Sequence, residues 1–136
     1  MIVDDNYLSA EGIEKNIDWE TLNAEIIHVC YNGTSAIEAM KKEPADLIIS
    51  DIEMPDLDGI SMSRQALEIN PMVKIILISA YDKFEYARRA LLLGALDYIE
   101  KPLDYAYLIQ KVKNAFALME KEQKNLQLLK QSTSLI

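Results

Sequence analysis

The sequence contains one cysteine and one histidine, and this scarcity excludes two kinds of site. Cys30 has no second cysteine with which to form an internal disulfide, so we expect a small, buried apolar side chain there. His28 has neither a second histidine nor a cysteine cluster beside it, which excludes a zinc site built from the usual nitrogen and sulfur ligands. We interpret His28 as a strand residue without a special role.

The chain also lacks an excess of positive charge and any long apolar run. It has 14 Lys and Arg against 22 Asp and Glu, a formal net charge of −8. Binding to the phosphate backbone of nucleic acid needs a basic face, so this segment is not expected to bind DNA by itself. No run approaches the ~20 apolar residues of a membrane span, and the first residues are unlike a signal peptide. We therefore expect a cytoplasmic protein that makes no membrane contact.

Half of the 136 residues are hydrophobic, which suits one globular domain. Short runs rich in Ile, Val and Leu alternate with amphipathic segments of helix length. This alternation is typical of an α/β fold in which a doubly wound parallel sheet has helices on both faces. We predict strands at 1–3, 25–30, 46–50, 74–78 and 96–100, and helices at 6–17, 34–42, 60–69, 83–93 and from 104 onwards.

Charged or hydroxyl side chains stand at the ends of four of these strands. Asp4 and Asp5 follow the first strand, and Asp51 follows the third. Ser79 and Lys101 stand directly after the runs at 74–78 and 96–100. Because right-handed crossovers place the carboxyl ends of parallel strands at one edge of the sheet, we expect all five side chains to meet there.

This set of side chains predicts phosphoryl-transfer chemistry. Clustered carboxylates repel one another unless a cation lies among them, and oxygen ligands suit Mg²⁺. Asp51 is central, so it is the candidate nucleophile that attacks a phosphoryl group and forms an acyl phosphate. We expect Asp5 and Asp51 to hold Mg²⁺, with Asp4 acting through water. Lys101 and Ser79 would then bind the phosphoryl oxygens.

With these features the chain resembles the receiver domains of two-component response regulators, over about residues 1–120. The resemblance implies a single-domain, flavodoxin-like and CheY-like (βα)5 three-layer sandwich with a five-stranded parallel sheet. The residues that carry it are Val3-Asp4-Asp5, Asp51, Met54-Pro55, Asp58-Gly59, Ser79-Ala80, Gly94-Ala95, Tyr98 and Lys101-Pro102.

The resemblance also implies roles for individual residues. Asp51 would accept a phosphoryl group from the phosphohistidine of a sensor histidine kinase. The backbone carbonyl of Glu53 would join the acidic pair as a ligand of Mg²⁺. Ser79 would be the hydroxyl switch and Tyr98 the aromatic switch, while Lys101 would contact the phosphoryl group. The peptide bond from Lys101 to the following proline is commonly cis in this family.

Two short loops, at 18–20 and 79–87, resemble receivers that precede an AraC-type (YesN-like) helix-turn-helix domain. On this interpretation residues 1–120 are the receiver domain, and residues 121–136 are a helical linker or tail toward an output domain that this sequence lacks. The chain would then influence transcription, and would reach DNA only through that absent domain.

The last predicted helix carries an a/d heptad pattern that one glutamate, Glu122, interrupts. Its members are Tyr105, Leu108, Val112, Ala115, Met119, Leu126 and Leu129. The part beyond Met119 has no core left to cover, so it is either a coiled-coil linker or a solvated tail. A homodimer would form through this helix, or through the face made by the fourth helix, the fifth strand and the fifth helix.

Two other functions compete with a phosphorylation switch. An enzyme that turns over a small substrate through an aspartyl phosphate usually needs a substrate cap, and the chain has no insertion of that size. A degenerate receiver would pair with its partner without phosphate, and Mg²⁺ with a phosphoryl analogue would leave it unchanged. We expect a phosphoacceptor switch that catalyses only its own phosphotransfer and dephosphorylation, not an enzyme.

Overall fold

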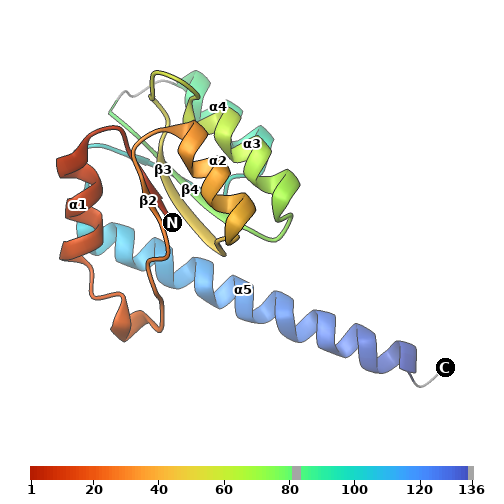
Figure 1. Ribbon diagram of the computed structural model, residues 1–136. Coiled ribbons are helices and arrows are strands. Elements are labelled where there is room, and N and C mark those ends of the chain that lie inside the picture. The colour runs from red at the N-terminus through yellow and green to blue at the C-terminus, as the bar shows by residue number, and fades with distance from the viewer. Residues whose placement is uncertain (81–83, 135–136) are drawn as a thin grey trace.

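The computed structural model describes residues 1–80 and 84–134 (Figure 1). Within these residues the strands form one five-stranded sheet in the order β2-β1-β3-β4-β5, and every pair of neighbours is parallel. The predicted fold class is thereby confirmed. The strands are β1 (Ile2–Val3), β2 (Val29–Cys30), β3 (Leu47–Asp51), β4 (Lys74–Ser79) and β5 (Asp97–Glu100).

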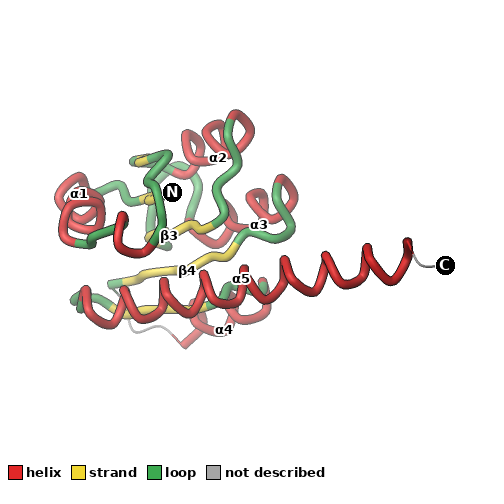
Figure 2. The backbone as a smooth tube through the Cα atoms, turned by 90° about the horizontal axis from the view of Figure 1, so that it is seen from below, coloured by secondary structure: helices red, strands yellow, loops and turns green. Residues whose placement is uncertain are grey.

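Helices cover both faces of the sheet, as Figures 1 and 2 show. Helices α2, α3 and α4 pack on one face of the sheet, and α1 and α5 pack on the other. Successive residues of each strand point to opposite faces, so each strand contributes side chains to both core layers. Ile48 and Leu77 belong to the first layer, and Ile49 and Ile76 to the second. The helices are α1 (Tyr7–Asn16), α2 (Gly33–Lys42), α3 (Gly59–Ile69), α4 (Phe84–Leu93) and α5 (Tyr105–Ser134), with a short 3-10 turn, η1 (Glu20–Leu22).

The second strand is much shorter than predicted. We expected 25–30, but β2 comprises only Val29 and Cys30. Its ladder partner β1 consists of Ile2 and Val3, which pair with Val29 and Cys30, and residues 25–28 therefore have little strand beside them. Hydrogen bonding to a neighbour, and not the apolar pattern alone, determines how far a strand extends.

The first helix is present, but its apolar residues do not all share one face. The sequence pattern led us to expect Leu8, Ile13 and Ile17 near one face, yet the Leu8 side chain is 80% exposed. At 100° per residue Leu8 lies about 140° around the helix from Ile13, which is buried together with Ala10 and Ile17. Trp19 is buried in the same layer, and its indole N–H donates to the carbonyl of Ile13 at 3.3 Å.

Gly94 ends α4 with a left-handed residue. Its φ is +96°, a conformation that glycine adopts at little cost. The N–H of Gly94 donates to the carbonyl of Leu91, and the N–H of Ala95 donates to the carbonyl of Ala90. These two bonds satisfy carbonyls at the end of the helix in a Schellman motif. The predicted start of this helix at residue 83 lies outside the described residues.

Helix α5 continues far beyond the sheet, as Figure 2 shows. Leu108 and Val112 in its first half are fully buried, whereas Leu126 is 48% and Leu129 is 64% exposed. Glu122, which interrupts the heptad pattern, lies 2.8 Å from the ammonium of Lys74 at the start of β4. This ion pair joins α5 to the sheet near the point where the helix extends beyond it. None of the described helices is long and apolar enough to cross a membrane.

Candidate functional site

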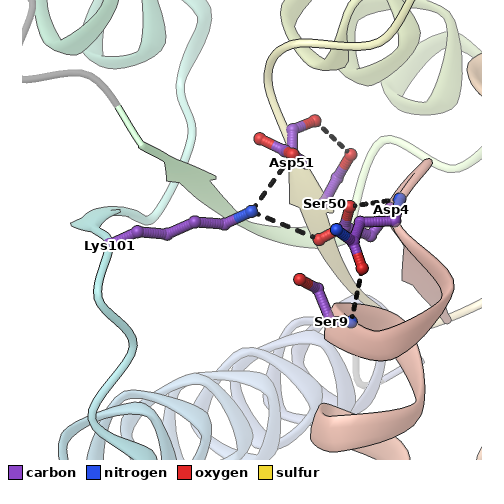
Figure 3. Close-up of polar contacts among 6 residues, drawn as sticks. Asp4, Ser9, Ser50, Asp51 and Lys101 are labelled. Atoms are coloured by element: carbon purple, nitrogen blue, oxygen red, sulfur yellow. Dashed lines mark hydrogen bonds and ion pairs between the residues drawn. The ribbon is translucent and has the colours of Figure 1, made fainter.

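Three carboxylates meet at the carboxyl edge of the sheet, as predicted. Asp4 and Asp5 follow β1, Asp51 ends β3, and one oxygen atom of each lies within 4.8 Å of the others. Asp4 and Asp51 are buried, and Asp5 is exposed. The adjacent parallel pairing of β1 and β3 brings these residues together from distant parts of the sequence. Figure 3 shows Asp4 and Asp51 turned toward the same space.

Asp4 is fixed by the turn that leads into α1. Its backbone N–H donates to the carbonyl of Cys30 at 3.0 Å, and its Oδ1 accepts a hydrogen bond from the N–H of Asn6 at 2.9 Å. Asn6 in turn caps α1, because its side-chain oxygen accepts from the N–H of Ser9 at 3.1 Å. The start of the helix therefore positions the carboxylate that immediately precedes it.

Lys101 joins the two buried carboxylates from the far side of the site (Figure 3). Its ammonium lies 3.3 Å from Oδ2 of Asp51 and 3.5 Å from Oδ2 of Asp4. The backbone N–H of Lys101 donates to the carbonyl of Ser79 at 2.8 Å, which ties the end of β5 to the end of β4. The Lys101–Pro102 peptide bond is cis, as the family resemblance implies.

The site has more negative than positive charge. Burial raises the pKa of Asp4, and the Asp51 carboxylate raises it further, against the opposing effects of the Asn6 N–H and Lys101. Burial alone would lower the pKa of Lys101, but the attraction of Asp51 and Asp4 outweighs it, so the pKa of Lys101 is raised. The site thus holds three carboxylates and one ammonium, and a bound cation would relieve the remaining repulsion between the carboxylates.

The donor set fits Mg²⁺. Carboxylate oxygens are the hard ligands that this ion prefers, and one exposed ligand beside buried ones leaves room for the waters that Mg²⁺ retains. Glu53, whose backbone carbonyl was predicted as a further ligand, is half-buried and lines the same cleft as Asp5. The chemistry of the cluster therefore supports a divalent cation and not a transition metal bound through nitrogen or sulfur.

The two predicted switch residues lie on β4 and β5. Ser79 is fully buried at the end of β4, one residue beyond Ile78, whose ladder partner is Asp51. Tyr98 is half-buried and packs against the core layer under α2, α3 and α4. Tyr98 pairs with Leu77 in the ladder, and Leu77 and Ser79 face the same way because they are two residues apart. Both switch residues therefore lie on the face that α4 covers.

The loop after Asp51 is held by two further aspartates. Asp56 accepts hydrogen bonds from the N–H groups of Gly33 and Thr34, at 3.3 and 3.0 Å, at the start of α2. Hydrogen bonds from the side chain and backbone of Thr34 hold the pKa of Asp56 well below its usual range. Asp58 caps α3 by accepting from the N–H of Ser61 at 2.8 Å. The loop that carries Glu53 is therefore anchored to two helices.

An open cleft of about 620 Å³ adjoins Asp5, the exposed carboxylate of the cluster. A second cavity, of about 270 Å³, lies at the opposite end of the sheet beside Trp19 and Phe116, away from the carboxylate cluster. The cleft is lined by Asp5, Ile52, Glu53, Met54, Pro55, Asp58, Tyr86 and Arg89.

Sequence reasoning missed four residues around the site. Asn6, the first residue of the predicted helix 6–17, could have been found, because Asn at the start of a helix is a capping signal. Asp56 could not, because its partners are more than 20 positions away. Tyr86 and Arg89 carry no local signal either, since their place in the cleft depends on how α4 packs beside the loop.

Comparison with known proteins agrees with this geometry. The family model described as "Response regulator receiver domain" matches residues 1–113. The receiver domain of AraT, a response regulator from Geobacillus stearothermophilus, superposes with a TM-score of 0.84 at 34% identity, covering 90% of this chain and 95% of that one. A two-component transcriptional regulator AraC from Clostridium phytofermentans has a TM-score of 0.80 at 31% identity, covering 91% and 95%.

Curated relatives are longer than this chain. It is 28% identical to the uncharacterized transcriptional regulatory protein YesN of Bacillus subtilis over 90% of its own length and 33% of that protein. It is 30% identical to the transcriptional regulatory protein HptR of Staphylococcus aureus over 79% of its own length and 42% of that protein. The chain thus spans less than half the length of these two relatives. The family model matches residues 1–113 of this chain, which is most of its length. The chain belongs to the response regulator receiver domain family of two-component systems.

Proposed function

We propose that Asp51 accepts a phosphoryl group from the phosphohistidine of a sensor histidine kinase, with Mg²⁺ bound, and that the phosphorylated domain changes conformation. The observation that carries the proposal is the ammonium of Lys101, 3.3 Å from Asp51 and 3.5 Å from Asp4, at a strand edge where three carboxylates converge. A nucleophile, a metal-binding cluster and a fixed positive charge are the parts that phosphoryl transfer to a carboxylate requires.

In the proposed reaction one carboxylate oxygen of Asp51 attacks the phosphorus atom. The bond from phosphorus to the donor's ring nitrogen breaks, and that nitrogen keeps the electron pair. The ammonium of Lys101, next to Asp51, would neutralise negative charge on the oxygens of the phosphoryl group. Ser79, at the end of β4, would donate a hydrogen bond from its hydroxyl to the same group. The chain itself would catalyse this transfer and the later hydrolysis of the acyl phosphate.

Mg²⁺ would be held by Asp5 and Asp51, by Asp4 through water, and by the backbone carbonyl of Glu53. When bound, it supplies the positive charge that the cluster lacks and draws the phosphoryl oxygens toward Asp51. Asp51 can then approach an anionic donor that the three carboxylates would otherwise repel.

Removal of Mg²⁺ is expected to lower the rate of phosphorylation by roughly 100-fold, because several kcal/mol of charge stabilisation is lost. The measurement is intact-mass analysis at timed intervals after addition of phosphoramidate, with Mg²⁺ and with EDTA. Excess Mg²⁺ added after EDTA should restore the rate. Equal rates with and without the metal would contradict the proposed role of the carboxylate cluster.

Phosphorylation would act by shifting an equilibrium between two arrangements of the domain. In the active arrangement the hydroxyl of Ser79 bonds the phosphoryl group, and Tyr98 moves inward on the same face of the sheet. The ladder supports this coupling, since Ser79 lies in line with Leu77 and Leu77 pairs with Tyr98.

The Ser79→Ala chain is expected to accept the phosphoryl group at a rate within a few-fold of the unaltered chain, but to switch less completely. The alanine leaves Asp51, Lys101 and the carboxylate cluster intact and removes only the coupling hydroxyl. Amide NMR spectra of both chains, with Mg²⁺ and beryllofluoride as the phosphoryl analogue, measure the response at Tyr98. Shifts of equal size at Tyr98 in the two chains would disprove this coupling route.

We propose that the output is control of transcription through a DNA-binding domain outside this sequence, with residues 1–120 as the receiver and 121–136 as the linker. The relatives named as transcriptional regulators and the continuation of α5 beyond the sheet support this division. A homodimer would form through α4, β5 and α5, where Leu91 and Tyr107 are exposed, or through the leucines of the α5 extension. The site of action would be the cytoplasm.

A further inference from the structure

We propose that Arg89 determines which phosphodonors the site prefers, by attracting the negative charge that develops on an anionic leaving group. This inference rests on the proposed role of Asp51 as the acceptor. It concerns a residue of α4 that the phosphoryl-transfer scheme above does not use.

Arg89 lies at the boundary of two hollows. It lines the open cleft at the edge of the carboxylate cluster, together with Asp5 and Glu53. It also lines a cavity of about 320 Å³ between α3 and α4, where Arg64 and Leu92 are its neighbours. Arg89 is an exposed residue, so a molecule that occupies the cleft can reach it.

Arg89 is the single positive charge among the described residues that line the cleft. The other charged residues there are Asp5, Glu53 and Asp58, and Asp58 is engaged in capping α3. Arg89 forms no ion pair with a carboxylate of the described residues. The adjacent Arg88 lies 4.0 Å from Glu85 and does not line the cleft.

The geometry of the transfer places the leaving group on this side of the site. The attacking and leaving atoms are roughly in line through phosphorus, so the leaving group points away from the Asp51 carboxylate. Lys101 meets Asp51 from the end of β5 and lines a different hollow, beside Pro102 and Tyr105. The open cleft borders the site through Asp5 and through Ile52 and Glu53, which directly follow Asp51 in the sequence, so its charged lining lies beside the outward path of the departing group.

Donors differ in the charge of the group that departs. When an acyl phosphate reacts, the bond between phosphorus and the acyl oxygen breaks, and the carboxylate leaves with the electron pair and a negative charge. When phosphoramidate reacts, the bond between phosphorus and nitrogen breaks, and protonated nitrogen leaves as neutral ammonia. A cation in the cleft stabilises the first transition state more than the second. Glu53, of opposite charge, should have the opposite effect.

The experiment compares acetyl phosphate with phosphoramidate as donors to four chains: the unaltered chain, Arg89→Ala, Arg89→Lys and the matched control Arg88→Ala. Initial rates of adduct formation are measured by intact mass with saturating Mg²⁺. We expect Arg89→Ala to lower the rate with acetyl phosphate by about fivefold, and the rate with phosphoramidate by less than about twofold. Arg89→Lys should retain most of the acetyl phosphate rate, and Arg88→Ala should match the unaltered chain with both donors.

The ratio of the two rates is the decisive quantity, because a general disturbance of the fold would lower both rates together. An equal loss with both donors, or no loss with either, would overturn the inference while leaving Asp51 as the acceptor. A loss of the same size in Arg88→Ala would also overturn it. If the unaltered chain gained no adduct from either donor, the proposed function itself would fail.

Discussion

The Asp51→Asn chain is expected to gain no phosphoryl group from phosphoramidate and Mg²⁺, whereas the unaltered chain gains a single adduct of about 80 Da. Asparagine keeps the shape of the side chain but has an amide in place of the nucleophilic carboxylate. Asp4 and Asp5 are not expected to take over the reaction, because Asp4 is buried and accepts a hydrogen bond from the N–H of Asn6, and Asp5 is exposed to water. Intact-mass analysis of both chains after equal incubation measures the difference.

Loss of the fold would not explain this result. Removal of one carboxylate relieves the repulsion that raises the pKa of Asp4, so Asp51→Asn should be at least as stable as the unaltered chain in thermal unfolding at neutral pH. Asp46→Asn is the matched control, because it makes the same change at an exposed residue directly before β3 begins, at the end of the strand opposite Asp51. A full adduct on Asp51→Asn, or its loss in Asp46→Asn, would contradict the assignment.

Gly59→Ala is expected to lower both the free energy of unfolding and the rate of phosphorylation. A Cβ at this position would collide with the backbone oxygen of Asp51 and lie 2.9 Å from the Cα of Ile52. The backbone cannot easily yield, because the N–H of Gly59 donates to the carbonyl of Ile52 at 2.7 Å and the N–H of Ile52 donates to the carbonyl of Ile78 at 2.9 Å. We expect a loss of about 2–4 kcal/mol, the range of severe overpacking in a core.

Urea unfolding and the rate of adduct formation measure the two effects. The useful comparison is Gly94→Ala, at the end of α4. Alanine there meets no atom within 4 Å but must adopt the φ of +96°, so it should cost about 1 kcal/mol and leave the phosphorylation rate unchanged. If Gly59→Ala proved as stable and as rapidly phosphorylated as the unaltered chain, this result would contradict the close packing of Gly59 in α3 against the backbone of Asp51.

The sequence predicted the sheet and the carboxylate cluster because both follow from local patterns. Fully buried strands such as β3 appear as continuous apolar runs, and parallel connections bring the ends of such runs to one edge. The positions of Asp4, Asp5 and Asp51 therefore needed no knowledge of packing. The switch roles of Ser79 and Tyr98 and the metal-ligand role of Glu53 came from the family resemblance and stay predictions.

The parts that the sequence did not predict depend on partners distant along the chain. The length of β2 depends on how many residues of β1 lie beside it, and the ion pair of Glu122 depends on where β4 begins. Arg89 enters the cleft only because α4 packs next to the loop that follows Asp51. Leu8 is a different case, since the helical period alone would have placed it away from Ile13.

The most direct test of the account is to locate the acyl phosphate chemically. The unaltered chain is incubated with Mg²⁺ and phosphoramidate, treated with borohydride, which reduces an aspartyl phosphate to homoserine, and digested for peptide mass mapping. The account predicts homoserine at position 51 and at no other aspartate. Homoserine at position 4 or 5, a stable phosphoryl group on His28, or an unmodified Asp51 would contradict it.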